Sequence, residues 1–173
     1  VLAVFSEQAA SASHVEAARS LDALARMPDC DGFDIDAIGA FHQIPLGADC
    51  PTTWCSVHKH RQPPKWAKYK NPVCILGVNL YGHPQAQNYW HNHVNKIPLG
   101  EGFVPVPSWE CVYVQKLLVS VYVDDFKLVG AKNNLGPMIT KLRAKMELDG
   151  AVPLNGDVYL GCKQENIAPP SDL

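Results

Sequence analysis

The sequence has no long apolar run, and charge of neither sign is in large excess. Its longest strongly apolar stretch, residues 117–123, is far shorter than the roughly 20 residues of a transmembrane helix. The start, VLAVF, has no basic flank and is too short for the apolar part of a signal peptide. We therefore expect no membrane segment. The net charge of −2 gives no general affinity for nucleic acid, so such binding would have to come from a local patch.

Motifs for common cofactors and for disulfide-rich folds are also missing. No GxGxxG, P-loop or GxSxG sequence occurs, which argues against dinucleotide-binding, P-loop and serine-hydrolase sites. Six cysteines are present, but none forms a CxxC pair and their spacing is not that of a disulfide scaffold. This usage favours a reduced, intracellular setting.

What remains is ample material for one folded domain. The 173 residues are 47% apolar and 18% charged, a balance that supports a sizeable core and excludes disorder. Helical spacing predicts helices over residues 11–26, where Ser13 and Glu16 form a capping box, over 135–148, and after Gly82-His83-Pro84. Alternating, β-branched or aromatic runs predict strands at residues 33–36, 73–78, 110–114, 117–122, 126–129 and 157–162. This order predicts an α+β fold in which helices cover one face of an antiparallel sheet.

One local patch of positive charge interrupts the balanced chain. Residues 57–70 contain five basic side chains and no acidic one: Lys59, Arg61, Lys65, Lys68 and Lys70. The segment is rich in loop-forming residues. It is either an ordinary solvated loop or a surface that meets phosphate groups, and the residues alone do not decide between these alternatives.

Carboxylates stand at two places where strands end. Asp36 closes one predicted strand, and Asp124 and Asp125 lie at the turn of a hairpin with apolar strands on both sides. Adjacent acids beside an apolar sheet are costly unless a cation compensates them, and two Mg²⁺ ions need carboxylates that converge from different strands. The plainer interpretation is a hairpin turn with solvated aspartates. If the site is real, the carboxylates of Asp36 and Asp124 should converge.

Four short blocks resemble motifs of the reverse transcriptases of copia-type LTR retrotransposons, in the family's order. Residues 122–125 read YVDD inside the apolar frame VSVYVDDFKLVG, which resembles the YxDD box. Upstream, DAIGAFHQIPL at 36–46 resembles the first catalytic motif, an Asp followed by a small residue and an aromatic. LYGHPQAQNYW at 80–90 is similar to the LYGLKQ…W block, and YLGC at 159–162 is similar to the segment near the primer grip.

The resemblance implies the palm of an RNA-directed DNA polymerase, with a ferredoxin-like sheet. Residues 1–30 would be an N-terminal helical segment, 31–162 the palm with partial fingers at about 47–72, and 163–173 a tail. Catalysis would use Asp36, Asp124 and Asp125, which with the backbone carbonyl of Ala37 would hold two Mg²⁺ ions, or Mn²⁺. Asp124 would be a more direct ligand than Asp125. The ions would activate the primer 3′-hydroxyl and neutralise the triphosphate.

Further residues match positions that bind substrate in the family. Phe41 would lie beneath the sugar and exclude a 2′-hydroxyl, although a core phenylalanine is the plainer interpretation. Gln85 would lie beside the incoming nucleotide and the template, whereas Trp90 fits core packing. The basic patch would meet template phosphates. The implied partners are an RNA or DNA template with its primer, deoxynucleoside triphosphates, and the flanking fingers, thumb and RNase H segments of a Pol polyprotein. The implied location is cytoplasmic, in virus-like particles, or nuclear.

The chain also departs from the family pattern. The upstream fingers segment that holds the triphosphate is not recognisable, and the thumb and RNase H parts are missing. In the second block, His83-Pro84 replaces the usual Leu-Lys. These departures keep open a different class of function, a catalytically inactive palm that binds nucleic acid or a protein partner. They also predict that this chain alone binds template–primer weakly and polymerises poorly.

Two other constellations carry less weight. Cys50, Cys55, His58 and His60 could approximate a zinc site, although their spacing fits no finger or knuckle. His91-Asn92-His93 spells HNH, but that nuclease motif needs residues dispersed over a ββα unit, so surface or packing roles are expected here.

Overall fold

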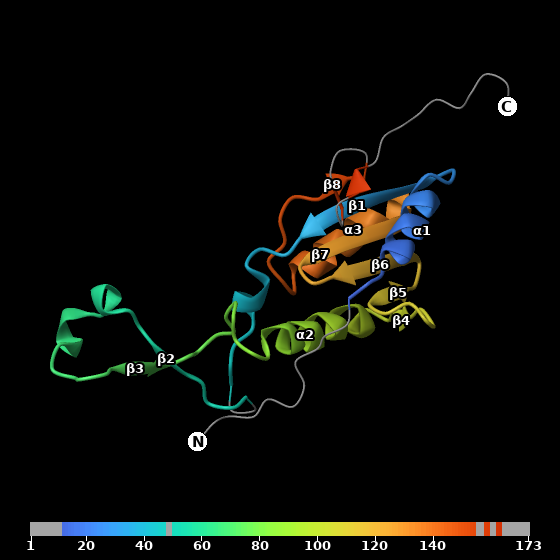
Figure 1. Cartoon of the computed structure of the whole chain (residues 1–173). Helices are drawn as coiled ribbons and strands as arrows, with labels where there is room; N and C mark the ends of the chain where they lie inside the picture. Colours follow the sequence, from blue (N-terminus) through green and yellow to red (C-terminus); the bar gives the residue numbers. More distant parts are fainter. Residues whose placement is uncertain (1–11, 48–49, 155–157, 160–161, 164–173) are drawn as a thin grey trace.

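The computed structural model describes residues 12–47, 50–154, 158–159 and 162–163, and shows an α+β body with a thin arm (Figure 1). The body contains a six-stranded sheet in the order β4-β5-β6-β7-β1-β8, with each neighbouring pair antiparallel. The strands are β1 (Cys30–Asp36), β4 (Val104–Pro105), β5 (Val112–Val114), β6 (Leu117–Tyr122), β7 (Asp125–Ala131) and β8 (Val152–Pro153). The predicted α+β class with an antiparallel sheet is confirmed.

Three α-helices accompany the sheet: α1 (Val15–Ala25), α2 (Ala86–Gly100) and α3 (Lys132–Arg143). If β4 and β5 are set aside, the body from β1 onward has the chain order β1, α2, β6, β7, α3, β8, which is a β-α-β-β-α-β order. Strands β4 and β5 extend the sheet at its edge beside β6. Among the described residues, no helix has the length and apolar character needed to cross a bilayer.

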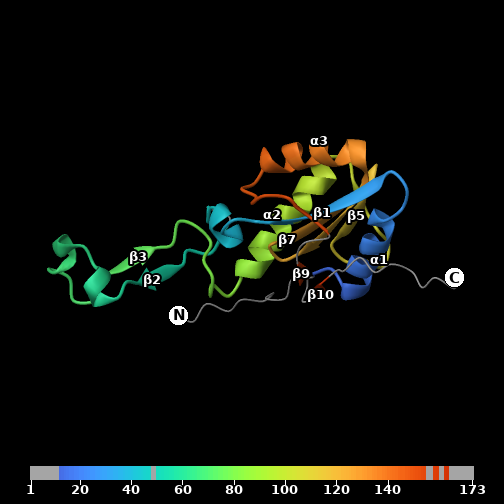
Figure 2. The ribbon, with the colours of Figure 1, turned by 90° about the horizontal axis from the view of Figure 1, so that it is seen from above.

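The helices lie on both faces of the sheet, which corrects the prediction that they cover one face (Figure 2). On one face, Trp90 and Val94 of α2 and Leu135 and Leu142 of α3 share a core with the strands. On the other face, α1 packs through a smaller cluster made by Ala17, Leu21, Ala25, Val112, Val129 and Leu154. The physical reason is that residues 126–129 of β7 are all buried, and successive strand residues point to opposite faces. Both faces therefore need a cover.

Several predicted element bounds shift in the structure. Helix α1 begins after His14, and no side chain caps it, so the predicted capping box is wrong. Helix α3 begins at Lys132 and ends at Arg143, because the chain then turns so that Leu148 pairs with Ala37 beside the sheet. The single strand predicted at 157–162 is instead a short hairpin of β9 (Val158–Tyr159) and β10 (Cys162–Lys163). Leu160, Gly161 and the predicted tail after Lys163 lie outside the described residues.

Lys127 of β7 is fully buried between the sheet and α1. Its Nζ lies 2.7 Å from Asp22 Oδ1 on α1 and 2.9 Å from Asp34 Oδ1 on β1. A buried ammonium is tolerated only when it is paired and hydrogen-bonded. This three-residue ionic cluster therefore fixes α1 to the face of the sheet that it covers.

The arm leaves the body between η1 (Ala40–Gln43) and α2 (Figures 1 and 2). It consists of a two-stranded ribbon, β2 (Trp54–Ser56) and β3 (Val73–Ile75), and two short 3-10 helices, η2 (Lys59–Arg61) and η3 (Pro64–Trp66). At its base the outgoing and returning chains are joined by hydrogen bonds from Leu46 N to Gly77 O, 3.0 Å, and from Asn79 N to Ile44 O, 2.8 Å. The predicted strand at 73–78 ends early, at Ile75.

Replacing Lys127 by Met should destabilise the chain by about 3 kcal/mol, because removing one member of a buried ionic cluster leaves the other charges without compensation. Denaturant unfolding of Lys127→Met against the wild type measures this loss. The matched control is Lys132→Met, at an exposed position, which should change stability by less than about 0.5 kcal/mol. Equal stability of the two variants would contradict the role given to Lys127.

Candidate metal centre

The register of β1 with β7 places two carboxylates opposite each other at one end of the sheet. Residues pair in succession from Cys30 with Ala131 to Asp36 with Asp125. Asp125 also pairs with Tyr122, the last residue of β6, so only Val123 and Asp124 form the turn between the two strands. The backbone N–H of Ala37, directly after Asp36, donates to Asp124 O at 2.9 Å and draws that turn toward β1.

The turn has an unfavourable backbone that a buried side chain supports. Val123 has a φ of 55°, a conformation that β-branched residues rarely adopt. The indole Nε1 of Trp90, which is only 1% exposed, donates to Val123 O at 2.5 Å. The predicted core position of Trp90 is confirmed, and this hydrogen bond gives it a second task. Trp90 holds the turn that carries Asp124.

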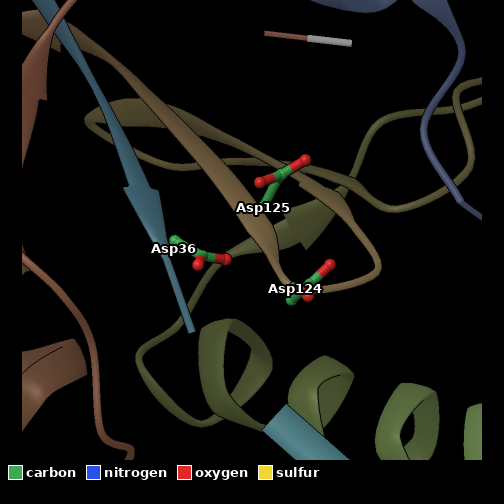
Figure 3. A group of neighbouring side chains, drawn as sticks. All are labelled: Asp36, Asp124 and Asp125. Atoms are coloured by element: carbon green, nitrogen blue, oxygen red, sulfur yellow. The ribbon is translucent and has the colours of Figure 1, made fainter. Parts of the chain in front are cut away.

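The carboxylates of Asp36, Asp124 and Asp125 form one cluster (Figure 3). One oxygen from each residue can be chosen so that all three atoms lie within 4.8 Å of one another. The predicted convergence of Asp36 and Asp124 is therefore confirmed. Among the described residues, this is the only group of three or more side chains that could hold a metal ion together.

The negative charges of the cluster act on one another. Burial, followed by the negative charges of Asp124 and Asp149, raises the pKa of Asp36 above its usual 3.8, while a backbone hydrogen bond from Ala37 opposes the shift. In the described part of the chain, no basic side chain forms an ion pair with Asp36 or Asp124. The repulsion would be relieved by a bound cation.

The donor set fits a hard divalent cation. Carboxylate oxygens are the ligands that Mg²⁺ and Mn²⁺ prefer, and the absence of sulfur and imidazole donors here disfavours zinc. Ala37 is buried between Asp36 and the turn, so its backbone lies beside the cluster. Whether its carbonyl completes the coordination stays a prediction.

An aromatic pair lies beside the carboxylates. The ring of Phe41, on η1, is 7% exposed and its centroid lies 4.5 Å from that of Tyr81. Tyr81 is 52% exposed, and its pKa is raised by burial and by the charges of Asp124 and Asp36. Phe41 thus belongs to the core, and Tyr81 presents the accessible aromatic surface. Sequence reasoning missed Tyr81 as a site residue, although it stands in the second block.

Gln85 and His83 lie where the arm joins helix α2. Gln85 is the residue before α2, and its N–H donates to His83 Nδ1 at 3.2 Å. His83 therefore carries its proton on Nε2, which lies 3.0 Å from Thr53 Oγ1 at the start of the arm. Burial lowers the pKa of His83 and favours this neutral form. No contact in the described residues links Gln85 to the carboxylates, so its predicted substrate role stays a prediction.

The basic patch lies on the arm and not beside the carboxylates (Figures 1 and 2). All five of its side chains are exposed: Lys59, Arg61, Lys65, Lys68 and Lys70. The Nζ of Lys68 lies 5.1 Å from the ring centroid of Tyr69, which is exposed as well. The patch therefore offers both charge and aromatic surface to solvent.

The other two constellations do not form the sites that their sequences suggest. Within the described residues, Cys50, Cys55, His58 and His60 do not come together as metal ligands. His93 stacks on Trp90, and His91 contacts Asn95 and Cys111 on the inner side of α2. Both histidines of the HNH tripeptide therefore have the packing roles that the sequence predicted.

Comparisons with known proteins assign the chain to no family. No protein-family model, no curated protein and no solved structure matches it. Any functional assignment therefore depends on the site itself and on the motif resemblance.

We predict that Mg²⁺ stabilises the wild-type chain and that Asp36→Asn abolishes this effect. At a Mg²⁺ concentration about a hundredfold above Kd, binding would add about 2.7 kcal/mol of stability. Without metal, the variant should be slightly more stable than the wild type at neutral pH. The pKa of Asp36 is higher in the folded chain than its usual 3.8, so the stability of the wild type falls as the pH rises from 3.8 through the folded-state pKa. Asn carries no charge and avoids this loss.

Thermal unfolding with and without Mg²⁺ measures both effects. Asp149→Asn is the matched control, because Asp149 acts on Asp36 through charge but lies outside the three-carboxylate cluster. It should keep the Mg²⁺ effect. An equal Mg²⁺-induced shift in wild type and Asp36→Asn would remove Asp36 from the metal centre.

Proposed function

We propose that the chain is the palm, with part of the fingers, of a reverse transcriptase of the copia type, an RNA-directed DNA polymerase. The observation that carries the proposal is the convergence of Asp36, Asp124 and Asp125 from a strand end and a hairpin turn. The order β-α-β-β-α-β with strands β6-β7-β1-β8 adjacent is that of a ferredoxin-like sheet, which supports a palm. The four motif blocks add support from the sequence.

In this proposal the three carboxylates hold two Mg²⁺ ions, which supply activation of the primer 3′-hydroxyl and neutralisation of the triphosphate. Asp36 and Asp124 contribute from separate segments, so the β1–β7 pairing and the Ala37–Asp124 hydrogen bond set their separation. Trp90 limits movement of the turn. The chain's part in catalysis is accordingly positioning and charge placement.

The aromatic pair is proposed to lie under the sugar of the incoming deoxynucleotide. Phe41 supports Tyr81 from the core side, and Tyr81 offers its ring near the carboxylates. A rigid ring at this place leaves no space for a 2′-hydroxyl. This arrangement favours deoxyribonucleotides over ribonucleotides.

The exposed lysines and the arginine of the arm are proposed to meet phosphates of an RNA or DNA template. Residues 50–100 contain no acidic side chain, so no negative charge within this segment offsets theirs. Binding of this kind is independent of sequence and falls steeply with salt, because it releases counterions from the nucleic acid. The primer, the triphosphates and flanking segments of a Pol polyprotein complete the proposed set of partners.

A second candidate, a palm that binds nucleic acid or a protein without catalysis, is favoured by one observation. Where the family has Lys in its second block, this chain has Pro84, and the preceding His83 is kept neutral by burial and is engaged with Thr53. The positive charge that would face a triphosphate is thus lost at this position.

Extension of a DNA primer on an RNA template by one nucleotide, with the chain completed at both ends by fingers and thumb segments, tests the catalytic proposal. Asp124→Asn should lower the rate by at least about a hundredfold, since removal of one strong electrostatic contributor to a transition state costs roughly that much. Asp125→Asn should be less severe. Asp149→Asn is the control and should retain wild-type extension.

Two results would contradict the catalytic proposal. One is extension by Asp124→Asn at the wild-type rate. The other is a chain completed at both ends by fingers and thumb segments that binds template–primer in a salt-dependent manner but extends it with neither Mg²⁺ nor Mn²⁺, which would favour the non-catalytic candidate.

The sugar-selectivity proposal predicts that Phe41→Val lowers the ratio of deoxyribonucleotide to ribonucleotide incorporation. Loss of the ring lets Tyr81 settle toward the core and opens space for the 2′-hydroxyl. Single-nucleotide incorporation kinetics with both substrates give the ratio. Tyr81→Phe, which keeps the ring, is the control. A variant Phe41→Val with lower stability but an unchanged ratio would leave Phe41 with a packing role only.

A further inference from the structure

Two cysteines face each other across the ribbon of the arm. Cys55 on β2 pairs directly with Cys74 on β3, and their Sγ atoms lie 3.3 Å apart. The Cys74 thiol also lies 3.8 Å from Cys55 O. Both side chains are half-buried, so a small reagent can reach them.

The backbone register allows a bond between these two residues without favouring it. The register that pairs Cys55 with Cys74 also places Thr53 opposite Leu76. Leu76 N donates to Thr53 O at 2.9 Å, so Thr53 and Leu76 form a hydrogen-bonded pair. Hydrogen-bonded and non-hydrogen-bonded pairs alternate along an antiparallel ribbon, so the cysteines, two residues further on, form a hydrogen-bonded pair. The Cα atoms of such a pair are about 5.5 Å apart, which is within the range that disulfides span, but the side chains lie farther apart than at a non-hydrogen-bonded pair. The observation that favours a bond is therefore the distance of 3.3 Å between the two Sγ atoms.

We infer that Cys55 and Cys74 form a modification site, at which a low-molecular-weight disulfide such as oxidised glutathione cross-links the two strands of the arm. One cysteine thiolate attacks the reagent, forms a mixed disulfide and displaces one glutathione thiolate, which takes up a proton. The second cysteine loses its proton and attacks the protein sulfur of the mixed disulfide, which releases the second glutathione. Two protein thiols are oxidised to one disulfide, and one oxidised glutathione is reduced to two thiols.

The surroundings favour this chemistry over metal binding. The hydrogen bond with Cys74 raises the pKa of the Cys55 thiol, and burial and the neighbouring sulfur's charge act in the same direction. A raised pKa leaves less Cys55 thiolate, which slows the first exchange step, but that step needs one thiolate only, whereas a metal bound by both sulfurs would need two. In the described part of the chain, no third ligand joins the two sulfurs to complete a metal site.

The cross-link would close the loop that carries the arm's charge. Residues 56–73 lie between the two cysteines and include all five basic side chains of the patch. The ribbon that now holds this loop has only three residue pairs, and the pair Trp54–Ile75 beside the cysteines is exposed. A two-stranded ribbon of this length is marginal by itself, so a covalent bond would restrict the loop strongly.

Incubation of the full chain with oxidised glutathione, followed by cleavage after lysine, tests the inference. Cleavage at Lys59, Lys65, Lys68 or Lys70 cuts the loop, so the two sides stay joined only if a disulfide links them. We expect one species without reductant, two after reduction, and a mass lower by two hydrogens before cleavage. The mixed disulfide should stay below about a tenth of the cross-linked form, because the second step is intramolecular.

Matched variants decide which sulfurs take part. Cys55→Ser and Cys74→Ala should each abolish the joined species, whereas Cys30→Ser and Cys50→Ser should leave its yield unchanged. Two outcomes would overturn the inference: stable glutathione adducts on Cys55 or Cys74 without cross-linking, or a disulfide mapped to another pair of cysteines. The readout does not depend on polymerase activity, so it stands apart from the proposed function.

Discussion

The pairing of β1 with β7 is the contact on which the rest of the structure depends. If β7 slipped by one residue against β1, its side chains would exchange faces. Lys127 would then point into the core formed with α2 and α3, and Phe126 would point toward α1. Gly130 helps to prevent such a slip on the other side of β7, because a Cβ at this position would lie 2.6 Å from the Cβ of Leu117. The same register brings Asp36 opposite Asp125. The candidate metal centre is therefore a consequence of how the core is packed.

This arrangement has a local cost that the surrounding core offsets. Burial and the charge of Asp124 raise the pKa of Asp36. Val123 adopts a backbone conformation that suits glycine better. Such features persist only where neighbouring structure enforces them, and here Trp90 and the paired strands do so. The three carboxylates lie close enough together to share a cation, and a bound cation would relieve their repulsion.

Much of the body could be predicted from the sequence, and the failures have a common cause. The hairpin follows from local patterns, whereas the convergence of Asp36 with Asp124 was expected from the metal ions they would share and from the motif resemblance. The second covered face does not, because Lys127 resembles a solvent-facing strand residue until Asp22 and Asp34, distant in sequence, are brought beside it. Tyr81 was missed for a similar reason, since only its contact with Phe41 brings it to the carboxylates. Pairwise contacts between remote residues leave little trace in a single sequence.

The arm is held mainly by backbone hydrogen bonds and not by a packed core, and one short segment connects it to the site. The arm has no core of its own, and its described charged side chains are exposed, so its position depends on the ribbon and on contacts at its base. His83 holds Thr53 at that base, and Tyr81, two residues earlier, packs on Phe41 beside the carboxylates. Residues 81–83 thus contact both the arm and the core beside the carboxylates. Under the proposed function, this segment would join the place where the arm meets a template phosphate to the place where the sugar lies.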